Sequence, residues 1–178
     1  MSGQAGRART FVAVWPDDAT IAALRSFERP DIAGVRWTTG DQWHVTLRFL
    51  GTLDGDESSA LERILGSVAR RHRSLTATLG PSSTVLGRNV LVAPVAGLDD
   101  LALSVTLATG RLGRPPDHDA FVGHLTLARR RRGRARLDAL GGRPVSATFP
   151  VSELAVVQSR MTPAGARYTT AARVPLTG

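Results

Sequence analysis

Residues 43–51, Trp-His-Val-Thr-Leu-Arg-Phe-Leu-Gly, have the alternation of a β-strand, and the rest of the chain can be interpreted around them. Successive side chains of a strand point to opposite faces of its sheet. One face is predicted to carry apolar side chains that enter a core, namely Trp43, Val45, Leu47 and Phe49. The other face is predicted to carry polar side chains, about 7 Å apart at each two-residue step, namely His44, Thr46 and Arg48.

The same short motif occurs a second time, as His-Leu-Thr-Leu at residues 124–127. The two histidines are separated by close to half the chain, and each follows a predicted strand and helix. Sequence identity between the halves is negligible outside the motifs, so the repeat is architectural. It predicts an α+β protein of two sheet-and-helix halves around a pseudo-two-fold axis. That axis would bring the two polar faces together across a cleft.

The other elements follow from apolar patterning and from turn residues. Strands are predicted at residues 10–15, 35–38, 75–79, 90–93, 148–149, 154–158 and 168–174. Helical spacing of apolar residues occurs over 21–27, 61–68 and 98–112, with a short helix candidate at 136–140. We expect residues 1–178 to form one bilobal domain, structured over about 10–176, with two antiparallel sheets flanked by helices around the central cleft.

Composition narrows the classes of protein and of partner. The formal net charge is +8, and all 23 basic residues are arginine, which favours a polyanionic partner or simply gives a solvated basic surface. Disulfides and thiolate metal sites are excluded because the chain has no cysteine. No apolar run is long enough to span a membrane, and no apolar segment follows the basic N-terminus. We expect a cytoplasmic monomer that does not associate with membranes.

Two His-x-Thr strands suit the chemistry of a phosphodiester. Two imidazoles can divide deprotonation of a nucleophile and protonation of a leaving oxygen at neutral pH without a metal. A threonine two residues further on points the same way and can donate to a phosphate oxygen, and arginine can add charge-assisted bonds.

Two other interpretations compete with this one. A single histidine on a strand is more often structural, but two copies in corresponding halves make that interpretation weaker. Metal binding is possible at Asp117-His118-Asp119, although turn chemistry explains that segment equally well. With four histidines and no His-Glu-x-x-His motif, we expect neither a metal nor a cofactor.

The chain resembles the RNA 2′,3′-cyclic phosphodiesterase family, also called 2′-5′ RNA ligase-like, of the 2H phosphoesterase superfamily. The resemblance extends from about residue 10 to 176. It is carried by four segments, at residues 11–16, 43–51, 124–129 and 159–168. It implies a metal-independent hydrolase that opens a 2′,3′-cyclic phosphate to a 2′-phosphate, with 2′-5′ ligation as the reverse reaction.

The resemblance also implies roles for individual residues. His44 would donate a proton to the departing 3′ oxygen, and His124 would accept one from the attacking water. Thr46 and Thr126 would bind phosphate oxygens. The expected substrates are RNA ends with a 2′,3′-cyclic phosphate, or cyclic nucleotides.

Arginines near the two motifs are candidates for substrate binding: Arg48, Arg129 and Arg130. Aligning the motifs places Arg48 opposite Ala128, and Arg129 is one step later. On a regular strand Arg129 would face away from the site, so it either reaches the site across a bulge or is a surface charge. The arginines from 130 to 136 either hold an RNA backbone or form a solvated loop.

Two alternatives for function stay open. The substrate could be a small cyclic nucleotide or another cyclic phosphate instead of RNA. The chain could also be a non-catalytic RNA-binding module, which predicts salt-dependent RNA binding without turnover.

Overall fold

The computed structural model describes residues 8–116, 120–131, 136–163 and 165–178. In chain order its elements are β1 (Arg9–Val14), α1 (Asp18–Arg25), β2 (Val35–Trp37), η1 (Gly40–Gln42), β3 (Val45–Gly51), α2 (Gly55–Ala69), β4 (Leu75–Leu79), β5 (Thr84–Leu86), β6 (Val90–Ala96), α3 (Asp99–Ala108), β7 (His124–Arg130), η2 (Asp138–Leu140), β8 (Ala147–Val151), β9 (Glu153–Thr162) and β10 (Gly165–Pro175). The two η elements are single 3₁₀ turns.

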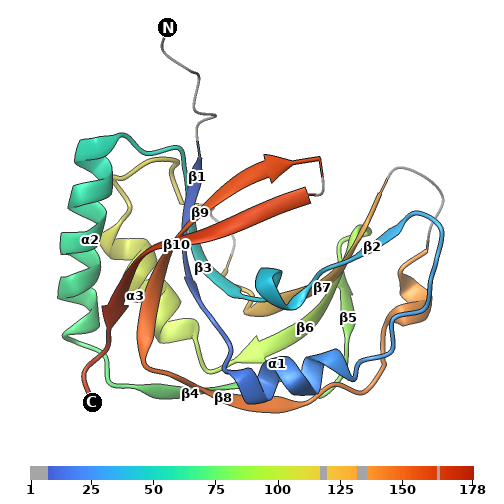
Figure 1. The fold of residues 1–178 in the computed structure, drawn as a ribbon. Helices are drawn as coiled ribbons and strands as arrows, with labels where there is room; N and C mark the ends of the chain where they lie inside the picture. Colours follow the sequence, from blue (N-terminus) through green and yellow to red (C-terminus); the bar gives the residue numbers. More distant parts are fainter. Residues whose placement is uncertain (1–7, 117–119, 132–135, 164) are drawn as a thin grey trace, which may run out of the picture.

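The strands form a curled, antiparallel sheet with the order β10-β9-β1-β3-β7-β6-β4-β8, shown in Figure 1. Within this order β2 pairs with β7, and β5 pairs with β6. The β10-β9-β1-β3 half meets the β7-β6 half at one residue pair, Val45 with Leu125. The expected α+β fold is confirmed, and the two predicted sheets are hydrogen-bonded into one continuous network.

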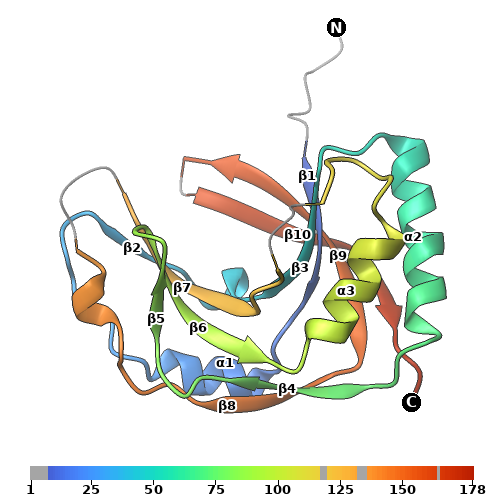
Figure 2. The same cartoon turned by 180° about the vertical axis from the view of Figure 1, so that it is seen from behind.

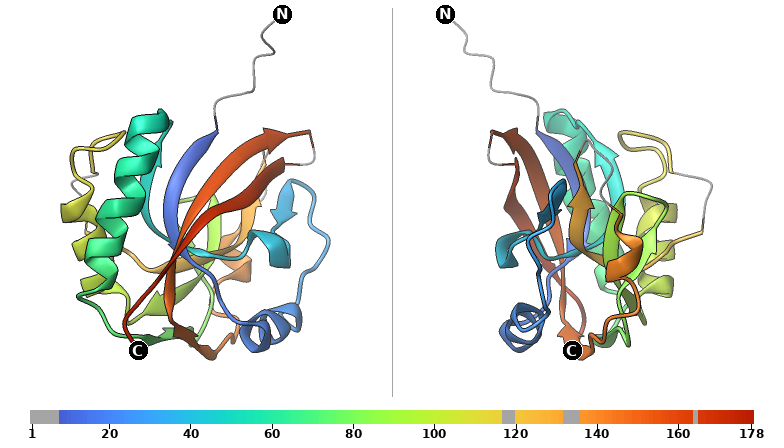
Figure 3. Two further views of the ribbon diagram at one scale, coloured as in Figure 1. Left: turned by 60° about the vertical axis from the view of Figure 1, so that its left-hand side comes forward. Right: turned by 90° about the vertical axis from the view of Figure 1, so that its right-hand side faces the viewer.

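Helices α1, α2 and α3 of the described residues pack against strands of this sheet. Helices α2 and α3 pack against each other, and they contact β10 and β3 respectively. Seen from behind in Figure 2, and from the side in Figure 3, these two helices lie together at one end of the molecule. Helix α1 contacts β8 of the other half. No helix among the described residues is long and apolar enough to cross a bilayer.

Local sequence explains where the helices begin. The Asp17 carboxylate accepts a hydrogen bond from the Thr20 amide at 2.9 Å and caps α1. At α2, Asp54 and Glu57 form a reciprocal capping box. Helix α3 ends at Ala108, short of the predicted 112, and the predicted helix at 136–140 is the single turn η2.

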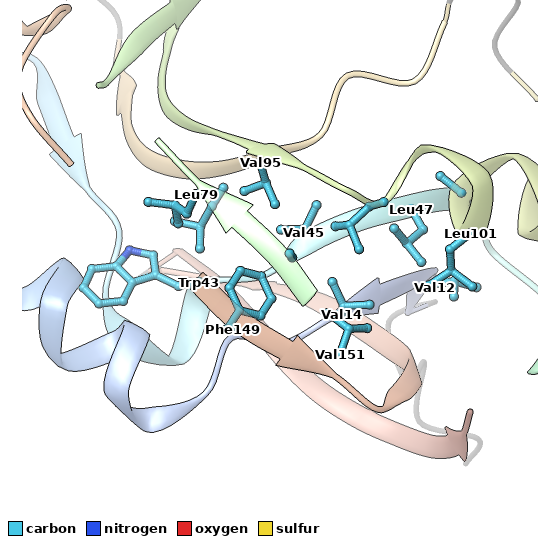
Figure 4. Packing of buried hydrophobic residues seen from close by; sticks show 14 of the residues in the cluster. Val12, Val14, Trp43, Val45, Leu47, Leu79, Val95, Leu101, Phe149 and Val151 are labelled. Atoms are coloured by element: carbon cyan, nitrogen blue, oxygen red, sulfur yellow. The ribbon is translucent and has the colours of Figure 1, made fainter. Parts of the chain in front are cut away.

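The main core lies between the sheet and the helices. Trp43 and Phe149 are its largest fully buried side chains, and Figure 4 shows them with Val45 and Leu47. A second, smaller cluster lies elsewhere on the sheet and combines Phe11, Ala13, Ala155 and Val157 with the half-buried Trp15, Phe49 and Tyr168.

Candidate active site

The two His-x-Thr segments lie next to each other at the junction of the two halves. Val45 and Leu125 pair across the antiparallel strands β3 and β7, and both are fully buried. The same register places His44 level with Thr126, and Thr46 level with His124. Because neighbouring residues alternate, all four half-buried side chains lie on the face opposite Val45 and Leu125. We call this surface of β3 and β7 the site face.

Each histidine is oriented by the backbone carbonyl two residues before it. Nδ1 of His44 lies 2.8 Å from the Gln42 oxygen, and Nδ1 of His124 lies 2.7 Å from the Val122 oxygen. A carbonyl can only accept, so Nδ1 of each ring carries a proton. In the neutral rings Nε2 is therefore the basic nitrogen, and it is available to a substrate in both halves.

Irregular pairing in β3 changes the predicted faces after Thr46. The register against β1 shifts between Val12, which pairs with Arg48, and Ala13, which pairs with Thr46. Leu47 is the extra residue of this β-bulge, which reverses the alternation beyond it.

The faces predicted for Arg48 and Phe49 are therefore wrong. Arg48 is only 6% exposed, and its guanidinium donates to the carbonyls of Phe49 and Arg114. Phe49 instead packs in the smaller cluster, beside Phe11. We do not retain Arg48 as a substrate ligand, because its guanidinium is engaged by the backbone.

Strand β7 has the corresponding bulge, at Leu127. Its register against β6 shifts between Leu91, which pairs with Ala128, and Val92, which pairs with Thr126. The shift turns Arg129 onto the site face, where its side chain is exposed. Arg130 is on the opposite face and pairs with Val35, which packs against the main core. We therefore do not retain Arg130 as a substrate ligand.

The two histidines have different neighbours despite these matching backbones. His44 is surrounded by aromatic rings, with centroid distances of 4.9 Å to Phe11, 5.4 Å to Trp15 and 4.8 Å to Tyr168. Burial, together with the charges of Arg129 and His124, lowers the pKa of His44 to about 4, against the opposing effect of the Gln42 carbonyl. At neutral pH the His44 ring of the free protein is therefore uncharged.

Comparisons with known proteins show similarity to phosphoesterases. A family model described as LigT like phosphoesterase matches residues 14–86. An RNA 2′,3′-cyclic phosphodiesterase of Geobacillus stearothermophilus is 29% identical over 153 residues, which are 80% of this chain and 48% of the relative. The chain thus spans about half the length of that curated relative.

Solved structures extend the likeness to nearly the whole chain. A Thermus thermophilus protein superposes with a TM-score of 0.79 and 26% identity over 96% of this chain and 98% of the other. E. coli LigT complexed with 3′-AMP superposes with a TM-score of 0.78 and 25% identity over 96% of this chain and 99% of the other. The chain is therefore similar in sequence and in fold to LigT-like phosphoesterases.

The site also contains residues that the sequence did not single out. Arg36 of β2 lies directly opposite Arg129 of β7. Burial raises the pKa of Tyr168, and the charges of both arginines oppose that rise. The sequence signal for Arg36 is the alternation of residues 35–37, where this polar residue lies between two apolar ones.

Thr38 is a further positioning residue that sequence reasoning missed. Its hydroxyl donates to the carbonyls of Thr126 and Leu127, at 2.7 and 2.8 Å, and accepts a bond from Trp43 Nε1 at 2.9 Å. These carbonyls belong to the bulge of β7, where the strand separates from β3. Thr38 thus connects Trp43, beside one motif, to Thr126 in the other.

Among the described residues, no group of three or more potential ligands could hold a metal ion. The possible ligands Asp117, His118 and Asp119 lie outside the described residues, as do residues 132–135 of the arginine-rich segment. His72 is not part of the site: its Nε2 lies 2.9 Å from the Ser104 hydroxyl of α3.

Proposed function

We propose that this protein is a LigT-like phosphoesterase, which hydrolyses the 2′,3′-cyclic phosphate at an RNA end to a 2′-phosphomonoester without a metal. The observation that carries the proposal is the pair of His-x-Thr segments, brought level with each other and each oriented through Nδ1 so that Nε2 is available. The curated relative is described as an RNA 2′,3′-cyclic phosphodiesterase, which supports this substrate class.

The proposed reaction is an in-line displacement at phosphorus. His124 Nε2 accepts a proton from a water molecule as its oxygen attacks the phosphorus. The bond from phosphorus to the 3′ oxygen breaks, and His44 donates a proton to that oxygen. Thr46 and Thr126 donate hydrogen bonds to the non-bridging oxygens, where negative charge accumulates. The reverse sequence would join a 5′-hydroxyl to the cyclic phosphate as a 2′-5′ linkage.

His44 can serve as the proton donor only if the substrate raises its pKa. The free ring, with a pKa of about 4, is neutral at pH 7. A phosphate anion beside the ring stabilises the imidazolium and opposes the effect of burial. The assignment of His44 as proton donor and His124 as proton acceptor follows the family resemblance. It requires the negative charge of the substrate, which raises the pKa of His44.

A titration tests this condition. The ring-proton signals of His44, assigned by comparison with His44→Gln, are followed by NMR against pH. We expect a midpoint near 4 in the free protein and a clearly higher one with saturating inorganic phosphate, since the protonated form binds the anion more tightly. A midpoint that phosphate leaves unchanged would mean that His44 does not face the phosphate.

Turnover and product identity test the reaction itself. EDTA-treated protein is incubated with 2′,3′-cyclic AMP, and the product is identified by chromatography against 2′-AMP and 3′-AMP. We expect 2′-AMP, at a rate that added EDTA does not change. If 3′-AMP forms, the proposed polarity of the histidines is wrong; salt-dependent RNA binding without any turnover would favour a binding module.

A further inference from the structure

A small pocket adjoins the site face at the end of β7. It is lined by residues of β2, η1, β7 and β10 and of the segment after β2: Arg36, Thr38, Gln42, Arg129, Ala166 and Tyr168. The β9–β10 hairpin extends past β1 and β3 toward β2 (Figure 1), and Ala166 and Tyr168 of β10 line the pocket. Tyr168 is shared with the reaction site, because the centroids of the Tyr168 and His44 rings are 4.8 Å apart. A group bound in this pocket would therefore lie beside a group bound between the histidines.

The pocket is positively charged. Arg36 and Arg129 pair directly across β2 and β7, so their side chains leave the sheet on the same face. Two guanidinium groups on one face attract an anion that enters the pocket. None of the described residues that line the pocket carries a carboxylate.

The pocket is also held in place by its own contacts. The Arg36 guanidinium lies against Gly165, where a Cβ would be 1.6 Å from Nη2, so only glycine leaves room for it. The Gln42 side-chain amide donates to the Ala166 carbonyl at 2.7 Å and ties η1 to the hairpin. These contacts confine the Arg36 guanidinium and hold one wall of the pocket before any ligand binds, which lowers the cost of binding.

Size restricts what the pocket can accept. Its volume is about 50 Å³, enough for a few water molecules or a group of similar size. Pockets that enclose a drug-sized ligand have volumes of roughly 300–1,000 Å³. A phosphate group fits this combination of size and charge, whereas a nucleobase does not.

We propose that this pocket is a second phosphate subsite, which binds the phosphodiester on the 5′ side of the terminal nucleotide. The inference rests on the proposed function, because it takes the cyclic phosphate to lie between His44 and His124. Arg129 is three residues from Thr126 along a bulged strand, so their backbones are within about 10 Å. That separation suits neighbouring phosphates of one RNA strand. The preferred substrate is then an oligonucleotide end, not a mononucleotide.

The test compares substrates that differ only in the upstream linkage. Values of kcat/KM are measured for 2′,3′-cyclic AMP, for the dinucleotide ApA ending in a cyclic phosphate, and for the same dinucleotide with a neutral methylphosphonate linkage. We expect the charged dinucleotide to exceed the other two by about tenfold, the scale of one charge-assisted hydrogen bond. In Arg36→Gln the two dinucleotides should become equivalent.

A matched variant controls for the loss of one positive charge. Arg160 is exposed and pairs with Arg167 in the β9–β10 hairpin, away from the lining of the pocket. Arg160→Gln should keep the preference for the charged linkage. The proposal is overturned if wild-type protein does not distinguish the two linkages, or if Arg36→Gln lowers turnover of the mononucleotide and both dinucleotides by the same factor.

A binding measurement separates failure of the subsite from failure of the proposed function. Calorimetry gives the Kd of ApA ending in a 2′-phosphate, with the charged or the neutral linkage, whether or not the protein turns over a cyclic substrate. We expect about tenfold tighter binding of the charged form in wild-type protein and equal binding in Arg36→Gln. Equal Kd values in wild-type protein would refute the subsite, even if cyclic AMP is hydrolysed.

Discussion

Replacing either His44 or His124 with alanine is expected to lower kcat/KM for a 2′,3′-cyclic nucleotide by about 10²–10⁴-fold. Each ring is proposed to transfer one proton in the same displacement, so either deletion removes a general acid or a general base. Both rings are positioned by a backbone carbonyl two residues before them, and alanine leaves that carbonyl free to bind water. Initial rates with the purified variants provide the measurement.

The chain offers a matched control for this prediction. His72 belongs to the segment after α2 and bonds to Ser104 of α3, outside the site face. His72→Ala should keep activity within about twofold of wild type, with at most a modest loss of stability. The proposed function would be contradicted if His44→Ala and His124→Ala behaved like His72→Ala while thermal unfolding showed all three variants to be folded.

The double variant, with both histidines replaced by alanine, provides a second experiment. In the double variant the loss of kcat/KM should be far smaller than the product of the two single losses, because the effects of residues that act as a unit are not additive.

His44 is enclosed by Phe11, Trp15 and Tyr168, and none of these aromatic contacts is found for His124 among the described residues. The two similar motifs therefore place their histidines in different environments. Such a difference is needed if one ring is to donate a proton and the other is to accept one.

Much of the fold could be predicted from the sequence because its signals are local. Alternation over residues 43–47 places Val45 and Leu47 in the core, and the acids before α2 cap that helix as expected. The duplication is a prediction from the order strand, helix and His-x-Thr, which each half of the sequence repeats. What joins the halves, the single pair of Val45 with Leu125, is non-local and leaves no signal in either strand.

The candidate site was predictable only as far as the first bulge. A bulge inserts one residue and reverses every face beyond it, and nothing in Leu47 or Leu127 marks it as the extra residue. This one effect buries Arg48, turns Phe49 toward Phe11 and brings Arg129 onto the site face. Arg36 could not be found from the sequence, since its relevance depends on pairing between β2 and β7.

The threonines provide the second large effect that we expect. Neither the Thr46 hydroxyl nor the Thr126 hydroxyl has a hydrogen-bond partner among the described residues, and both are half-buried on the site face. A hydroxyl that stabilises nothing in the folded protein is available to a phosphate oxygen. Thr46→Val and Thr126→Val are each expected to lower kcat by about 10²–10³-fold, the effect of losing one preorganised donor to developing charge.

Valine is the informative replacement because it keeps the branched shape and suits a strand. Thr78 of β4 is exposed, so Thr78→Val makes the same chemical change away from the site and should leave kcat within about twofold of wild type. Thermal unfolding should show all three variants to be folded. Because equivalent bulges place Thr46 and Thr126 at equivalent points of the two halves, the two site variants should lose similar activity. A large loss at one threonine and none at the other would show that phosphate lies against one half only, and the shared site between the halves would have to be abandoned.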